Sequence, residues 1–534
     1  MARDRATTQP KRPIKNSLWN VGLLVYTSLL FLVTTPFYIR FLGSEHFGLY
    51  MLLLAMIGPF SLVGLGVGRA TIKFVAECEG RKDRKTSADF IASTLFFNIM
   101  VGLVGAVVIF ALARLFATSV FKIGLEDQAL FQKTLYWLAV RWFVAQVTAT
   151  FSGVIQALQR YDVTAKLQGT TQTAIALSGL AALAYGGSLL TLVQIQTVLT
   201  LLAGIGWYLV CRSMMGGVRL LPRLHIETLR KTIDFGFYTT MASLGGLMTQ
   251  CSDRYLLGIF VGPVAIGYYS VCWGVLEKLF SVIYNGSVVL FPAVSRFQGE
   301  GDQVAIERIF IAGTLISIVV GSFFFVPLFV LSGDLLNLWL GPEYWTNAGA
   351  VLMVLALVGL ANSVNIVPSM FLLGIGKTRW VALKAGVYGA MTLGVALILI
   401  PRFGLRGAAW GLGTGVFVYL GFVYLTCKYL LHWSDSGRFL TKLVGILGVS
   451  FTLAFVLYGV RRLVFGEALI QNLPGLGVLA FGLAILSAII SILIIRQVFK
   501  SEMRFSEVWN SVLSRWRWGP FNSTGPAKRD AYGS

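Results

Sequence analysis

The sequence has few charged residues, few histidines and few cysteines for its length. Only 13% of its 534 residues are charged, whereas 56% are hydrophobic and the mean hydropathy is +0.76. Soluble domains carry about 25% charged residues, so this composition excludes a soluble fold. The three histidines and five cysteines stand singly along the chain. The sequence therefore predicts no metal site and no disulfide framework, and we expect no cofactor.

Acidic residues are scarce relative to basic ones. The chain has 44 Lys and Arg against 23 Asp and Glu, which gives a net charge of +21. In a soluble protein this excess would suggest a nucleic-acid partner. In a membrane protein it arises because cytoplasmic loops collect Lys and Arg, so we expect no nucleic acid here. The chain also has no Walker sequence, so nothing in it indicates ATP binding.

Long apolar windows are abundant, and they predict the fold class. Windows near the length of about 20 residues that crosses a bilayer lie at 18–37, 48–67, 92–110, 135–158, 167–184, 189–210, 239–260, 266–289, 309–331, 348–373, 380–400, 407–425, 444–460 and 478–495. The sequence therefore predicts an all-α polytopic membrane protein with about 14 transmembrane helices.

A polar and basic stretch interrupts the series of windows and suggests how the chain is divided. This stretch follows the sixth window and resembles a cytoplasmic linker. We predict two six-helix lobes and two additional C-terminal helices. The predicted segments are a basic N-terminus at 1–17, an N-lobe at 18–212, the linker at 213–234, a C-lobe at 235–431, helices 13 and 14 at 432–498, and a basic tail at 499–534.

The distribution of basic residues predicts the orientation of the chain. With fourteen spans, about 33 of the 44 Lys and Arg fall in loops on one side of the membrane, which the positive-inside rule assigns to the cytoplasm. In this count Lys384 belongs to a cytoplasmic segment together with Lys377 and Arg379. Both termini are then predicted to be cytoplasmic.

The two lobes show an internal repeat at a shift of about 219 residues. This shift places residues 40–50 on residues 259–269 and matches Gly43 with Gly262, Gly48 with Gly267 and Tyr50 with Tyr269. Nearly the same shift pairs two further loops. Because six is an even number of spans, both lobes insert the same way up, related by an axis along the membrane normal. The alternative explanation is that Gly-rich helix turns are common.

Ionisable residues inside the windows are the main candidates for function. A charge near the bilayer centre costs roughly 2.5–3.5 kcal/mol, so it normally faces protein or a water-filled cavity. These residues are Arg141, Asp253, Arg254, Glu277 and Lys278. The acidic ones, Asp253 and Glu277, are candidates for ion pairing or ion coupling. Asp253 is expected to satisfy Arg141, since both fall in the outer half of the bundle. The alternative is that these are buried pairs that steady helix packing.

The second window ends in the glycine-rich stretch GLGVGRATIK, residues 64–73. Glycines permit close approach or local unwinding there, and Arg69 and Lys73 follow at the cytoplasmic mouth. The alternative for these two residues is ordinary anchoring on the positive side. Together Arg69, Lys73, Arg141, Arg254 and Lys278 would form a cationic track suited to a phosphate or pyrophosphate headgroup.

Several motifs resemble those of bacterial polysaccharide and O-antigen flippases, which export lipid-linked oligosaccharides. They are PFYIRFLGSEHFGLY at 36–50, GLGVGRA at 64–70, DRYLLGIFVG at 253–262, GYYS at 267–270, LWLGPEY at 338–344 and PRFGLRGAAW at 401–410. Each motif is short, but their order and the topology are those of the family from about Asn16 to about Leu431. The family belongs to the multidrug, oligosaccharidyl-lipid and polysaccharide (MOP) exporter superfamily, whose MATE-like fold has two six-helix lobes around a central cavity.

The resemblance implies a transporter that is not an enzyme. Its substrate would be a polyprenyl-pyrophosphate-linked oligosaccharide, moved from the inner to the outer leaflet of the bacterial cytoplasmic membrane by alternating access. By the same resemblance, helices 13 and 14 would help to form a groove for the lipid tail. The expected partners are membrane lipid, H⁺ or Na⁺ as a coupling ion, and polysaccharide polymerase machinery. The match carries over Asp253 as the acidic position of the seventh helix and Arg69 as the basic end of the second.

Two other functions remain open from the sequence. An ion-coupled multidrug exporter of the same superfamily would favour an acidic cavity, which the predominance of Arg and Lys in the spans disfavours. An integral-membrane glycosyltransferase or polymerase would need catalytic residues on substantial external loops. The external loops look short, and Asp334 and Glu343 lie beside residues typical of an interfacial turn, such as Trp339.

Overall fold

The computed structural model describes residues 11–62, 67–81, 83–216, 221–230, 232–233, 252–288, 290–431, 435–466 and 472–499. All regular structure in these ranges is helical. The helices are α1 (Lys11–Ile57), η1 (Gly58–Leu62), α2 (Val67–Gly80), α3 (Arg84–Leu115), η2 (Phe116–Val120), α4 (Leu125–Ala157), α5 (Tyr161–Ala184), α6 (Leu189–Met214), α8 (Pro263–Ser287), α9 (Leu290–Glu300), α10 (Gln303–Val330), α11 (Ser332–Leu340), α12 (Pro342–Gly374), α13 (Thr378–Phe403), α14 (Leu405–Gly413), α15 (Gly415–Leu425), η3 (Thr426–Leu430), α16 (Ser436–Phe465) and α17 (Leu473–Val498).

The predicted spans coincide with these helices. Ten described helical segments are long and apolar enough to cross a membrane, and the first of them, Trp19–Phe60, contains the first predicted window and much of the second. Helices α5 and α8 cover the fifth and eighth windows. Of the seventh window, residues 252–260 are helical and residues 239–251 lie outside the described residues. The predicted all-α polytopic membrane fold is confirmed.

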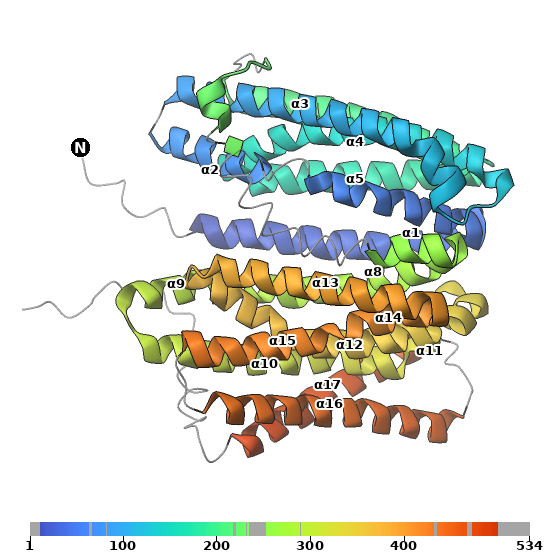
Figure 1. Cartoon of the computed structure of the whole chain (residues 1–534), viewed down its shortest axis with the longest axis vertical. Coiled ribbons are helices and arrows are strands. Elements are labelled where there is room, and N and C mark those ends of the chain that lie inside the picture. The colour runs from blue at the N-terminus through green and yellow to red at the C-terminus, as the bar shows by residue number, and fades with distance from the viewer. Residues whose placement is uncertain are drawn as a thin grey trace, which may run out of the picture.

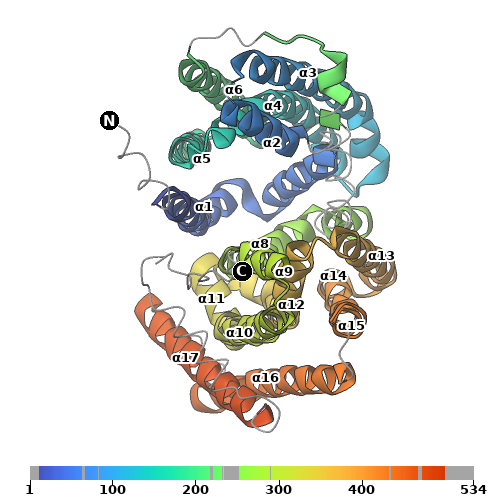
Figure 2. The ribbon, with the colours of Figure 1, turned by 90° about the vertical axis from the view of Figure 1, so that its left-hand side faces the viewer.

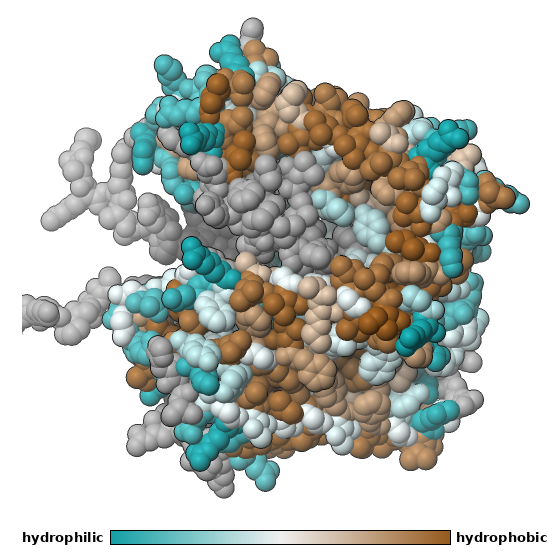
Figure 3. All heavy atoms as spheres, viewed as in Figure 1, coloured by the Kyte–Doolittle hydropathy of each residue, from teal (hydrophilic) through white to brown (hydrophobic). Residues whose placement is uncertain are grey.

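The helices run side by side and form two groups (Figure 1). Helices α1–α6 gather on one side, α8–α15 on the other, and α16 and α17 pack beyond them, as the end-on view also shows (Figure 2). Helix α1 borders α8 between the groups. Hydrophobic side chains form a broad band around the middle of the molecule, and hydrophilic ones gather at both ends of the helices (Figure 3). This distribution fits a protein embedded in a bilayer.

The last two helices attach to the bundle through small and charged side chains. Ser487 on α17 donates a hydrogen bond to the backbone oxygen of Ser322 on α10 at 3.0 Å. Small residues let membrane helices approach closely and supply hydrogen bonds where the solvent offers none. On α16, Arg461 Nη2 lies 2.6 Å from Asp334 Oδ1, and the Asp334 side chain is only 1% exposed. The sequence predicts Asp334 only as part of an interfacial turn; in the structure it also anchors α16 through Arg461.

Helix α1 is two helices joined at Gly43, which has φ 75° and ψ 166°. The matched residue of the repeat, Gly262, has φ 129° and ψ 178° and stands just before α8. Side chains with a Cβ rarely adopt such positive φ values. The backbone thus turns in the same way at both members of this matched pair.

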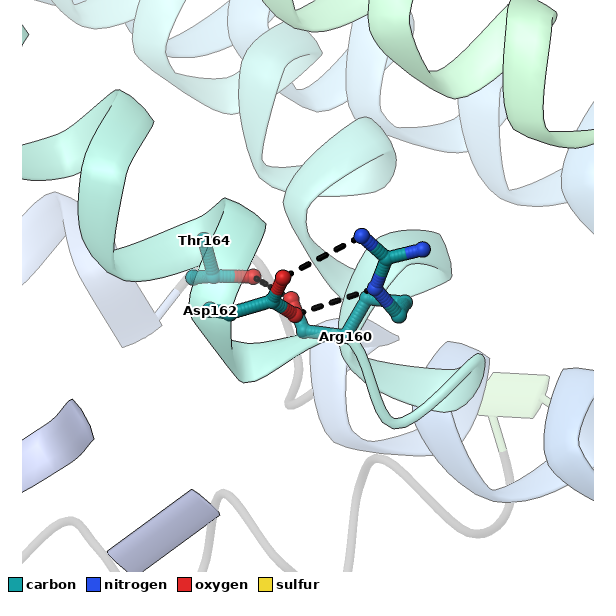
Figure 4. A network of polar contacts seen from close by, with 3 residues as sticks. All are labelled: Arg160, Asp162 and Thr164. Atoms are coloured by element: carbon teal, nitrogen blue, oxygen red, sulfur yellow. Dashed lines mark hydrogen bonds and ion pairs between the residues drawn. The ribbon is translucent and has the colours of Figure 1, made fainter. Parts of the chain in front are cut away.

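The turn between α4 and α5 belongs to the same repeat. Gln159 has φ 57°, and its counterpart after α12, Gly376, has φ 76°. Arg160 follows, and its guanidinium donates to both carboxylate oxygens of Asp162 at 3.0 and 3.1 Å, while Thr164 Oγ1 donates to the Arg160 backbone oxygen (Figure 4). The hydrogen bonds from Arg160 lower the pKa of the Asp162 carboxyl. This pair lies at an exposed loop, so it defines a helix start and is no candidate for transport.

Some predictions concern residues that the structure leaves undescribed. These are residues 1–10 of the basic N-terminus, residues 500–534 of the basic tail, residues 63–66 of the glycine-rich stretch, and the side chain of Arg69. The predicted segment boundaries and the cytoplasmic location of both termini stay predictions.

Candidate functional site

In the α1–α6 half, a buried polar cluster surrounds Arg141. Arg141 projects from α4, and its Nη1 donates to Gln196 Oε1 on α6 at 2.7 Å. Gln196 is 1% exposed, and its Nε2 donates in turn to the hydroxyl of Tyr50 on α1 at 3.1 Å. Tyr38, which lies on α1 as well, stacks on Tyr50 with ring centroids 6.2 Å apart. Gln196 is a neutral amide, so this contact brings no negative charge to the guanidinium.

The predicted pairing of Asp253 with Arg141 is wrong. Asp253 is 3% exposed, and its Oδ2 accepts a 2.6 Å hydrogen bond from the hydroxyl of Tyr269 on α8. Within the described part of the chain, Arg141 has no carboxylate within ion-pairing distance. The rotation of the helices turns the two side chains toward different neighbours, although both lie in spans.

Arg254 follows Asp253 on the same helix and is half-buried. Its Nε is buried, and no hydrogen-bond partner for it exists among the described residues. Such an orphaned guanidinium N–H is costly in a low-dielectric interior, so it favours an anion or water as partner. The unpartnered Nε of Arg254 therefore fits an anion-binding role better than a purely structural role in helix packing.

The other described cations of the predicted track, Lys278 and Lys73, make contacts that are common for lysines in proteins. Lys278 on α8 is half-buried, with Nζ 5.9 Å from the ring of Phe31 on α1, and Glu277 beside it is exposed. Lys73 on α2 is 45% exposed and lies 4.0 Å from Glu77, one turn away. These contacts do not join the four described cations into one cluster. The cationic track therefore stays a prediction.

One buried cation escaped the sequence analysis. The prediction placed Lys384 in a cytoplasmic segment, but the structure buries it in α13 with only 6% of its surface exposed. Its Nζ donates to Asn365 Oδ1 on α12 at 2.7 Å and also to Ser369 Oγ. The sequence did contain a signal for this burial, because Lys384 lies inside the apolar window 380–400. The prediction instead grouped it with the basic residues a few positions earlier.

The two halves press together at the end that contains Gly43, which we call the closed end. A methyl group on Gly48 would come within 2.0 Å of the Pro263 backbone oxygen, and one on Gly267 within 3.3 Å of the Ser44 backbone oxygen. The 219-residue shift relates Ser44 to Pro263 and Gly48 to Gly267, so the contact is reciprocal, as a two-fold axis between the lobes requires.

A carboxylate bridges the two halves at the closed end. Glu343, at the start of α12, accepts hydrogen bonds at Oε1 from Ser44 Oγ at 2.6 Å and from the hydroxyl of Tyr268 on α8 at 2.7 Å. Beside it, Lys122 Nζ donates to the backbone oxygen of Phe260 at 2.7 Å. These contacts thus join the two halves at the closed end.

Solved structures share this fold. The chain superposes on the lipid II flippase MurJ in an inward closed conformation with a TM-score of 0.69 and 12% identity, covering 90% of this chain and 99% of that one. It superposes on an inward-facing MATE-family multidrug resistance transporter of the MOP superfamily with a TM-score of 0.65 and 14% identity, covering 78% of this chain and 99% of that one. These superpositions define the fold class: the chain has the fold that these two MOP-superfamily structures share.

The sequence profile of the family described as polysaccharide biosynthesis protein matches residues 14–298, more than half of the chain. The chain belongs to this family. A protein of Shigella flexneri described as an O-antigen transporter is 21% identical over 399 residues, covering 74% of this chain and 93% of the relative. A Haloferax volcanii protein described as a low-salt glycan biosynthesis flippase is 26% identical over 261 residues, covering 48% of this chain and 53% of the relative.

Proposed function

We propose that this protein is a flippase for a polyprenyl-pyrophosphate-linked oligosaccharide, which it moves from the inner to the outer leaflet of a bacterial cytoplasmic membrane. The observation that carries the proposal is the guanidinium of Arg141, half-buried in a membrane span and held by the neutral amide of Gln196. A cation without a carboxylate attracts a phosphate, whereas a cavity for cationic drugs would be acidic. The descriptions of the related O-antigen transporter and glycan flippase support the same substrate class.

Both halves contribute to the proposed anion path. Arg141 comes from the α1–α6 half, whereas Arg254 and Lys278 come from the α8–α15 half. Arg69 and Lys73 on α2 would receive the diphosphate first, at the cytoplasmic mouth. The closed end then faces the outer side, both termini are cytoplasmic, and alternating access opens the closed end. The sugar fills the watery cavity while the lipid tail remains in the bilayer.

The membrane potential assists this direction of transport. Each negative charge that moves outward across an inside-negative membrane gains about 2.3 kcal/mol per 100 mV. A diphosphate therefore moves outward without ATP, and a coupling ion, H⁺ or Na⁺, adds to the drive. The polymerase machinery that consumes the flipped oligosaccharide would be the protein partner on the outer side.

The test is flipping of a fluorescent lipid-linked oligosaccharide in proteoliposomes. We expect Arg141→Ala and Arg254→Ala each to lower the initial rate about tenfold or more, and Lys278→Ala to lower it less, because losing one charge-assisted contact costs about 1.5–3 kcal/mol. Arg438→Ala is the matched control, because the Arg438 side chain is 72% exposed. Full flipping by all three cation variants would remove the cationic path from the mechanism.

A further inference from the structure

Lys384 occupies a closed polar site inside the α8–α15 half. Its Nζ donates to Asn365 Oδ1 and Ser369 Oγ, both on α12, and lies 6.0 Å from the ring centroid of Tyr419 on α15. Ser369 itself donates to the Asn365 backbone oxygen at 2.6 Å, so its oxygen is free to accept from the lysine. In the part of the chain that the structure describes, no carboxylate pairs with Lys384.

This geometry accommodates the lysine in both of its protonation states. A neutral amine has two N–H donors, and the site offers two oxygen acceptors. For the third N–H of an ammonium, the described residues offer the ring of Tyr419, which is a weaker partner than an oxygen. Burial favours the neutral form, while the two oxygens and the ring favour the charged form. A lysine with a permanent charge would instead be expected to pair with a carboxylate.

The groups that face Lys384 are tyrosines rather than ions. Tyr388, on its own helix, stacks on Tyr419 with ring centroids 4.7 Å apart. Tyr388 in turn lies near Asp253 of the preceding span, whose carboxylate accepts from Tyr269. Asn365 and Ser369 on α12 do not titrate, and the exposed Arg406 is the charged residue of α14. Tyr388 and Tyr419 thus lie between Lys384 and a buried acid, Asp253.

We propose that Lys384 is a proton-binding site that couples translocation to the proton gradient. The neutral amine takes a proton from water on the outer side while the closed end is open, and the resulting ammonium returns it to water on the inner side. One N–H bond forms and later breaks, so the residue ends unchanged. This proposal rests on the proposed flippase function, because it supplies the coupling ion for that transport cycle.

The site itself is tested without substrate, by thermal unfolding of the purified full-length protein in nanodiscs between about pH 6 and pH 9. A group that titrates in the folded state makes stability depend on pH. We expect the difference in melting temperature between wild type and Lys384→Met to change by about 1–3 °C across this range. Lys384→Arg keeps a permanent charge, so its difference in melting temperature from wild type should also depend on pH. This variant replaces Lys384→Met in the experiment if the Met variant fails to fold.

Lys377→Met is the matched control, because Lys377 is exposed at the start of the same helix. Its melting curve should run parallel to that of wild type at every pH. If the Lys384 variants also run parallel, Lys384 does not titrate in the folded protein and the proposal is overturned.

The coupling is tested in proteoliposomes with an imposed proton gradient. We expect the gradient to accelerate flipping by wild type and by Lys377→Met, and the acceleration to be lost in both Lys384 variants. Equal acceleration in the Lys384 variants would overturn the coupling role. If wild type flips no lipid-linked oligosaccharide at all, the flippase proposal fails, and the unfolding experiment still decides whether Lys384 binds a proton.

Discussion

The indole Nε1 of Trp339 donates a 2.7 Å hydrogen bond to the backbone oxygen of Leu32. Leu32 precedes Pro36 by four residues, and a proline has no N–H to give to that oxygen. Helix α11 thus supplies, from the other half of the molecule, the donor that α1 lacks. Separating the halves would leave this carbonyl unpaired. The hydrogen bond therefore stabilises the conformation in which the two halves are in contact.

Trp339→Phe should therefore destabilise the closed protein by about 1 kcal/mol, because a carbonyl within a membrane span loses its donor. Pro36→Ala restores an N–H to α1, so the same Trp339→Phe change should cost markedly less in that background. The measurement is a double-mutant cycle of thermal unfolding. Equal costs in both backgrounds would show that the indole stabilises the protein only by packing.

Gly48→Ala should prevent close contact of the two halves. The added methyl would come within 2.0 Å of the Pro263 backbone oxygen, which is held by the first turn of α8. Forced overpacking of this kind costs about 1–3 kcal/mol and should appear as a lower melting temperature. Gly22→Ala on the same helix is the control, because nothing lies within 4 Å of its added methyl. A Gly48→Ala protein as stable as Gly22→Ala would contradict the reciprocal contact.

Arg461→Ala should be strongly destabilising, by about 3–5 kcal/mol, because it leaves the 1% exposed Asp334 side chain without its 2.6 Å partner. Replacing both residues with leucine should recover much of this loss. Arg438→Ala removes an exposed pair with Asp435 and should change stability by about 1 kcal/mol or less. Unfolding measurements of the three variants test whether the pair holds α16 to the bundle.

Glu343→Gln should loosen the closed end, because an amide accepts more weakly than a carboxylate from Ser44 and Tyr268. Since Glu343 is partly solvated, we expect a loss of about 1 kcal/mol and faster labelling of a cysteine placed at Ala265, which is buried at the start of α8. Glu45→Gln, an exposed neighbour, should leave the labelling rate unchanged. Labelling that is equally slow in both variants would exclude Glu343 as a bridge between the halves.

The helical spans were predictable, and the partners of their buried charges were not. All fourteen predicted windows overlap described helical residues, because a chain in lipid must satisfy its backbone within each span and therefore shows its spans as long apolar runs. The repeat was visible because a turn with positive φ favours glycine, as at Gly43 and Gly262. Depth along the helix axis brought Arg141 and Asp253 to similar levels, but it carried no information on rotation.

Sequence alone therefore determined the fold class, the repeat and the presence of unusual charges in the spans. Only the tertiary structure decided that Arg141 contacts Gln196, that Asp253 contacts Tyr269, and that Lys384 is enclosed by Asn365 and Ser369. The physical reason is geometric. Hydropathy reports whether a segment is in the membrane, whereas successive side chains point about 100° apart, and the packing of helices distant in sequence determines which direction faces which neighbour.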